Sequence, residues 1–164
     1  MTVKGDKARF AIEYALDANP HGVWLNGTIA IWVDSQRVAA QEGSLRDYLH
    51  ILEGIATLRG RCANPRLFSE PRDKAIALLD AALFSGDDGE LDALAEREQW
   101  GLLFIDLGIA GWKFYAIESE DLSRLRLLAV GPEQSLEVVV PAEEAFDVFR
   151  AASGGLRELA EAHR

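Results

Sequence analysis

The sequence predicts an α+β fold: an antiparallel β-sheet with helices packed on one face, in a single domain that spans residues 1–164. Three observations lead to this fold class. Some segments alternate apolar and polar residues, as half-buried strands do, while others repeat apolar residues at i, i+3 and i+4, as amphipathic helices do. In addition, short hairpin spacings join the strand-like segments, without the long crossovers that parallel strands require, which favours an antiparallel sheet.

Alternating segments predict strands in the first and last thirds of the chain. In residues 9–16, the side chains of Phe10, Ile12 and Tyr14 fall on one face, which is typical of a strand with one buried side. A dense turn signal over residues 17–22 separates this strand from the next. The predicted strands cover residues 9–16, 23–33, 37–40, 102–107, 112–118, 122–130 and 135–140.

Helical periodicity predicts two helices in the middle of the chain. Ser44 stands where it can cap the first of them, because a serine oxygen accepts a hydrogen bond from a backbone N–H in the first helical turn. Gly60 predicts the end of this helix. After a predicted loop over residues 61–71, Pro71 opens a second helix that stops before Gly86.

Two further helices complete the predicted pattern. The acidic residues at 87–92 suit a helix N-terminus and predict a short helix that runs through Trp100. Pro141 opens a final helix that carries a long apolar stripe. Gly154 and Gly155 lie inside this helix, and each costs about 1 kcal/mol relative to alanine, so we expect a kink or early fraying there.

Charge and composition narrow the classes of partner. The chain has 17 Lys and Arg residues against 27 Asp and Glu residues, which gives a net charge of −10. Nucleic acids and anionic membranes are therefore disfavoured as partners, because both attract a basic surface, whereas a basic protein is compatible. The sequence shows no apolar run that predicts a signal peptide or a membrane span, so we expect a cytoplasmic protein.

No motif in the sequence predicts catalysis, a metal site or a cofactor. Glycine-rich phosphate loops are absent, and the histidines have no metal-ligand spacing. Cys62 is the only cysteine, which excludes a disulfide within the chain and a cysteine-based zinc site. We interpret it as a free thiol in a loop, because no partner base is evident.

Clustered carboxylates leave three interpretations open. They could form a solvated acidic surface, an acid–base pair in the cleft of a small hydrolase, or a docking surface for a basic protein. A fourth alternative is an adaptor domain that forms homodimers through a sheet edge or a tryptophan-bearing face. From the residues alone, a binding protein is favoured over an enzyme.

Several blocks of sequence, in a fixed order, resemble the immunity protein 42 family of bacterial polymorphic toxin and contact-dependent inhibition systems. The most specific block reads Asn-Pro-x-Gly-x-Trp-Leu-x-Gly and occupies residues 19–27. The blocks that carry the resemblance are residues 9–14, 19–27, 44–49, 64–68, 78–83, 111–115 and 140–144. They extend over most of the chain.

The resemblance implies a non-enzymatic inhibitor that binds the C-terminal domain of a cognate toxin in the cytoplasm. It supplies neither catalytic residues nor a contact surface. Many such toxins are nucleases with a basic cleft, and carboxylates could cover a cleft of that kind. We therefore expect the contact residues among two acidic groups and two tryptophans: Asp87, Asp88, Glu90 and Asp92; Glu118, Glu120 and Asp121; and Trp24 and Trp32.

Overall fold

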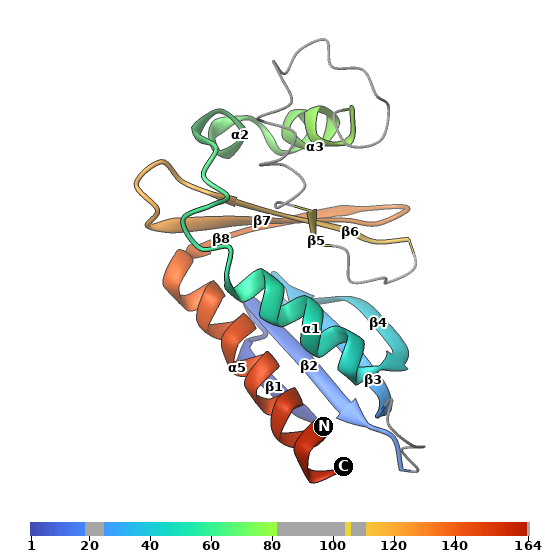
Figure 1. Ribbon diagram of the computed structural model, residues 1–164. Coiled ribbons are helices and arrows are strands. Elements are labelled where there is room, and N and C mark those ends of the chain that lie inside the picture. Colours follow the sequence, from blue (N-terminus) through green and yellow to red (C-terminus); the bar gives the residue numbers. More distant parts are fainter. Residues whose placement is uncertain (19–24, 82–103, 106–110, 164) are drawn as a thin grey trace.

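The computed structural model describes residues 1–18, 25–81, 104–105 and 111–163. Its strands form two four-stranded antiparallel sheets, each with its strands in chain order (Figure 1). The α+β class is therefore confirmed, although two sheets stand where one was predicted. The first sheet contains β1 (Thr2–Asp6), β2 (Phe10–Leu16), β3 (Asn26–Val33) and β4 (Gln36–Ser44). The second contains β5 (Phe104–Ile105), β6 (Lys113–Glu118), β7 (Arg124–Val130) and β8 (Ser135–Pro141).

Helices cover the second sheet on both sides. The described helices are α1 (Leu45–Ala56), α2 (Pro65–Ser69), α3 (Arg72–Asp80) and α5 (Ala142–Ala162). Helices α1 and α5 lie side by side over the first sheet, and α5 also contacts β7 and β8 of the second sheet, whose opposite side carries α2 and α3 (Figure 1). Every residue from Phe114 to Ser119 is consequently buried, because neither face of β6 meets solvent.

Each sheet runs directly into a helix. Strand β4 ends at Ser44 and α1 begins at the next residue, where the Ser44 side chain accepts a hydrogen bond from the backbone N–H of Asp47 at 3.4 Å. The predicted cap is thus confirmed. Strand β8 ends at Pro141, and α5 follows at Ala142 in the same way.

The structure differs from the prediction at three places before residue 72. Strand β1 lies ahead of the first predicted strand and pairs with β2. Helix α1 ends at Ala56, four residues before Gly60. Inside the predicted loop lies the short helix α2, because the Asn64 side chain accepts a hydrogen bond from the N–H of Leu67 at 3.0 Å and Pro65 follows it in the first turn. This asparagine–proline pair is a helix start and not only a turn signal.

A buried arginine ties α2 to the second sheet. Arg126 on β7 is 3% exposed, and its Nη1 donates to the carbonyl oxygens of Leu67 and Glu70 at 2.7 Å each. Its Nε donates to Glu137 on β8 at 2.9 Å. The guanidinium therefore supplies donors to carbonyls at the C-terminal end of α2, which the helix itself leaves unpaired.

Helix α5 continues through its two glycines to Ala162, so of the two expected alternatives, a kink or early fraying at Gly154 and Gly155, the fraying does not occur. A Cβ atom added to Gly155 would lie 2.0 Å from the hydroxyl oxygen of Tyr14, whereas one added to Gly154 would meet nothing within 4 Å. Tyr14 is 3% exposed on β2. Gly155 thus allows α5 to approach the first sheet, and packing on that sheet offsets the intrinsic cost of the glycines.

The two adjacent glycines form a matched pair for a stability test. Replacing Gly154 with Ala should raise the free energy of unfolding by about 0.5–1 kcal/mol, because alanine loses less backbone entropy in a helix. Replacing Gly155 with Ala should lower it by about 1–3 kcal/mol through the clash with the Tyr14 hydroxyl. Urea denaturation of both variants measures the difference, and equal effects would contradict the close approach at Gly155.

Candidate functional site

Trp32 belongs to a polar cluster on the side of the first sheet that faces away from α1 and α5. Its indole N–H donates to Oε2 of Glu13 at 3.1 Å, and Nζ of Lys7 lies 4.2 Å from the centroid of its ring. Lys7 Nζ also lies 2.5 Å from Glu13 Oε2, and Arg37 Nη2 lies 3.0 Å from Glu13 Oε1. We call Lys7, Glu13, Trp32 and Arg37 the Glu13 cluster. It joins residues of β2, β3 and β4 with the loop after β1.

The charge of Glu13 depends on its three partners. Glu13 is 4% exposed, and burial by itself raises the pKa of its carboxyl group. Hydrogen bonds from Lys7 and Trp32, together with the positive charges of Lys7 and Arg37, outweigh this effect and lower the pKa below its ordinary value of 4.5. The cluster therefore holds a partly buried indole in a fixed orientation, with Lys7 over its ring and its N–H bonded to Glu13, an arrangement suited to anchoring a protein interface.

The tip of the β6–β7 hairpin carries two of the predicted acidic residues, Glu120 and Asp121, and both are exposed. The Asp121 carboxylate accepts hydrogen bonds from the Ser119 hydroxyl at 2.6 Å and from the Ser123 hydroxyl at 2.8 Å. These hydrogen bonds lower the pKa of Asp121 to about 2, with a smaller contribution from the charge of Arg124. The hairpin tip is therefore acidic and ordered by its own side chains.

Glu118 does not present its carboxylate to a partner, in contrast to the expectation for this acidic group. It is fully buried, and its Oε2 accepts hydrogen bonds from the Gly60 N–H at 2.7 Å and from the Cys62 thiol at 3.3 Å. Burial and the neighbouring carboxylate raise the pKa of Cys62 far above its ordinary value. Glu118 therefore fixes the loop between α1 and α2. Cys62 is a free thiol in this loop, as expected, and its burial makes it inert.

The predicted contact residues do not form one patch among the described residues. Trp32 belongs to the first sheet, whereas Glu120 and Asp121 belong to a hairpin of the second. Five predicted residues lie outside the described part of the chain: Trp24, Asp87, Asp88, Glu90 and Asp92. The predicted helix over residues 87–100 lies outside it as well.

The partners of Trp32 are not evident from the sequence alone. Glu13 stands on the polar face of an alternating strand, which is a visible signal, but its contact with Trp32 depends on the register of β2 with β3. That register pairs Glu13 with Ala30 and places Trp32 two positions farther along β3, opposite Ala11 and on the same face as Glu13. Arg37 comes opposite Trp32 through the pairing of β3 with β4, which passes a bulge between Ile31 and Trp32.

A void of about 10 Å³ lies at the junction of the two sheets and is lined by apolar residues, among them Phe10, Ile31 and Phe149. Such a space admits at most one water-sized molecule. In the described ranges, no three His, Cys, Asp or Glu side chains are placed to hold a metal ion. None of the helices within those ranges has the length and apolar character needed to cross a membrane.

The lowered pKa of Glu13 predicts a pH dependence of stability. A carboxyl group whose pKa is lower in the folded state stabilises the fold above the pKa of the unfolded chain and loses this contribution as the pH falls through the folded value. Glu13→Gln should therefore destabilise the protein by about 1–3 kcal/mol at neutral pH, and the difference from wild type should shrink below about pH 4.5.

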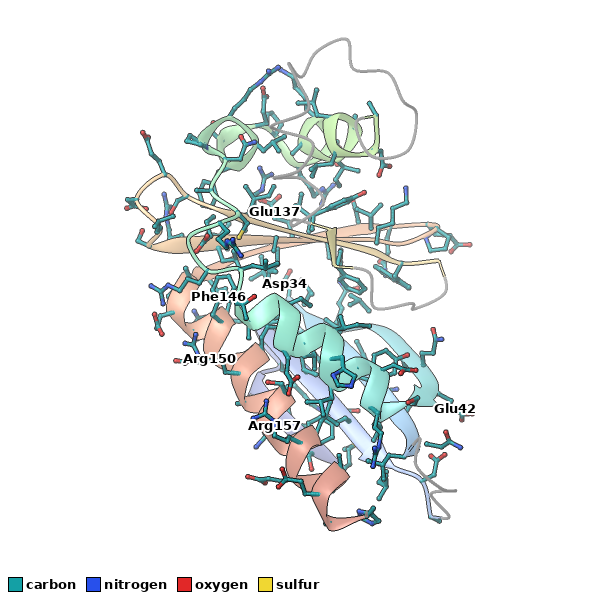
Figure 2. All side chains as sticks on the ribbon, viewed as in Figure 1. Asp34, Glu42, Glu137, Phe146, Arg150 and Arg157 are labelled. Atoms are coloured by element: carbon teal, nitrogen blue, oxygen red, sulfur yellow. The ribbon has the colours of Figure 1, made fainter. Side chains whose placement is uncertain are left out.

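Urea denaturation at a series of pH values measures this effect. Glu42→Gln, at an exposed position of strand β4 in the same sheet, serves as the control and should follow the wild-type profile (Figure 2). A constant difference between Glu13→Gln and wild type across the acidic range would contradict the electrostatic role of the Glu13 cluster.

Comparison with solved structures gives a match to CdiI from Burkholderia dolosa AUO158. The two chains share 17% sequence identity with a TM-score of 0.76, and the match covers 94% of this chain and 99% of the other. At this level of identity, the likeness establishes the fold. The chain matches none of the curated proteins with which it was compared.

A family model also matches the sequence over nearly the whole chain. The model of immunity protein 42 matches residues 1–153 of the 164 residues. These residues include the Glu13 cluster, the hairpin tip and most of α5. The resemblance found in the sequence is therefore confirmed, and this chain belongs to the immunity protein 42 family.

Proposed function

We propose that this immunity protein neutralises its cognate toxin by covering the toxin's active or substrate-binding site, without catalysis of its own. Its toxin-neutralising function follows from membership of the immunity protein 42 family, and this match over residues 1–153 is the observation that carries the proposal. Covering a site requires a stable protein–protein interface rather than a catalytic constellation. In this proposal, the chain binds the C-terminal domain of the toxin in the cytoplasm.

Charge supports a basic toxin surface as the partner. The net charge of −10 attracts a cationic protein over distances of about one Debye length and raises the rate of encounter. A nuclease domain has a cationic cleft of this kind, because it binds phosphates. The exposed carboxylates of Glu120 and Asp121, together with the acidic residues at 87–92, are the proposed contacts with such a cleft. Trp32, which the other residues of the Glu13 cluster hold in one orientation, is the proposed aromatic anchor.

Co-expression with the toxic C-terminal domain encoded beside this gene tests the proposed function. The chain should restore growth of cells that express the active toxin domain, and the two should purify together as a one-to-one complex. A catalytically inactive toxin domain should form the same complex, because occlusion does not require turnover. An active toxin that kills despite co-expression, with no complex recovered, would contradict the proposal.

Charge reversal at the hairpin tip tests the proposed acidic contacts. Glu120→Lys should slow association with the toxin domain and reduce the salt dependence of the association rate, because steering depends on the charges near the interface. Glu133→Lys makes the same charge change at another exposed turn, between β7 and β8, and controls for net charge. Stopped-flow association at several salt concentrations measures both, and equal slowing by the two variants would exclude a local role for Glu120.

The same measurement applies to the acidic segment at residues 87–92. The double variant Asp87→Lys and Asp88→Lys should slow association in the same manner. An association rate unchanged from wild type would remove this segment from the proposed interface.

A further inference from the structure

A groove follows the outer edge of the first sheet, between strand β1 and helix α5. Strand β1 is the edge strand of its sheet, with β2 as its neighbour on one side. The groove has a volume of about 600 Å³. Its lining residues are Val3, Lys4 and Gly5 of β1, Pro141 at the end of β8, and Glu143, Glu144, Asp147, Val148 and Ala151 of α5.

The strand lines this groove with its edge rather than with one of its faces. Val3, Lys4 and Gly5 are consecutive residues, and consecutive side chains of a strand point to opposite faces of the sheet. Only the strand edge presents all three residues to the same space. On such an edge, alternating backbone N–H and C=O groups point away from the neighbouring strand and can pair with an added strand.

Helix α5 forms the wall of the groove and determines which side chains an added strand could carry. Val148 and Ala151 provide an apolar surface close to β1, and a Cβ atom on Gly5 would lie 2.8 Å from Val148 Cγ2. The helix also contributes the carboxylates of Glu143, Glu144 and Asp147, against the single lysine, Lys4, on the strand. The wall therefore suits apolar and cationic side chains.

Arginines of this chain already contact these carboxylates, but through exposed ion pairs. Arg9 Nη2 lies 2.9 Å from Glu144, Arg150 Nη2 lies 2.7 Å from Glu143 and 2.6 Å from Asp147, and Arg59 also contacts Glu143. Figure 2 shows Arg150 on the outer side of α5. The side chains of these arginines are 38–43% exposed. Exposed pairs of this kind contribute little, so cationic side chains of a partner can replace the arginines at small cost.

We propose that the β1 edge is the binding site for an extended segment of the toxin domain, which adds a strand to the first sheet. The side chains of that segment on the α5 side would be apolar and cationic, whereas its backbone would pair with β1. This proposal rests on the immunity function proposed above and identifies the surface through which the partner is held. It assigns the backbone of Thr2–Asp6, rather than an acidic loop, as the main contact.

Charge argues against a second copy of this chain as the occupant. Two copies paired through the same edge by two-fold symmetry would bring together two chains that each carry a net charge of −10. A cationic toxin segment meets this wall without such repulsion.

Hydrogen exchange in the purified complex tests the proposal directly. Backbone amides of β1 should exchange at least about tenfold more slowly in the complex than in the free protein, because an added strand accepts from those that face the groove. Amides of β4, the strand at the opposite edge of the same sheet, are the internal control and should exchange at the same rate in the complex and in the free protein. A complex that neutralises the toxin but leaves β1 exchange unchanged would overturn the proposal while leaving the immunity function intact.

Two other outcomes would also overturn it. If no complex forms, the immunity function on which the proposal depends fails as well. If β1 becomes protected in the free protein as its concentration rises, the edge is an interface between two copies of this chain.

A variant that fills the groove provides a second measurement. Ala151→Trp, at an exposed position of α5, should raise the Kd for the toxin domain at least about tenfold by occupying the space beside β1. Ala77→Trp makes the same change at an exposed position of α3 and should leave the Kd within about twofold of wild type. Equal affinities for the two variants, with both folded by circular dichroism, would overturn the proposal.

Discussion

The packing of α5 against both sheets is the interaction on which the rest of the structure depends. Phe149 and Phe146 are each at most 2% exposed, and the rings of Phe149 and Phe10 on β2 lie 5.2 Å apart. The helix contacts β1 and β2 of the first sheet, and β7 and β8 of the second. Burial of one phenylalanine contributes about 1.5–3 kcal/mol, so two on one turn are a large share of the stability of a small domain. Helix α5 therefore packs with both sheets in one hydrophobic core.

This packing also fixes the geometry of the proposed binding surface. Gly5 and Gly155 allow close contact between α5 and the first sheet at Val148 and Tyr14, respectively. The wall of the groove is therefore held at a constant distance from the β1 edge by the hydrophobic core. A surface that is already in its binding conformation loses less conformational entropy on association, and this favours affinity. The residues that stabilise the fold and those that line the groove lie on adjacent sides of one helix.

Local patterns in the sequence predicted the elements better than their arrangement. Alternation located β2, β6 and β7, and Ser44 marked the start of α1, because these signals depend on neighbours in the sequence. The division into two sheets depends on long-range packing, so no local signal could distinguish it from a single sheet. The burial of Glu118 also depends on a distant contact, with Gly60 and Cys62, more than fifty positions away. Trp32 was identified as notable from its residue type, whereas its partners Glu13 and Arg37 required the strand register.

The placement of basic residues explains how an acidic protein can bind specifically through a groove. Arg126 is buried against carbonyl groups, Lys7 and Arg37 hold Glu13, and Arg150 bridges two carboxylates of α5. These cations serve the fold locally, while the excess of carboxylates sets the long-range field that attracts a cationic partner. Such a field is weakly directional and cannot by itself select one toxin from other basic proteins. Selectivity must therefore come from short-range contacts, and backbone pairing at β1 beside a wall of fixed shape supplies them, because it requires an extended segment with matching alternate side chains.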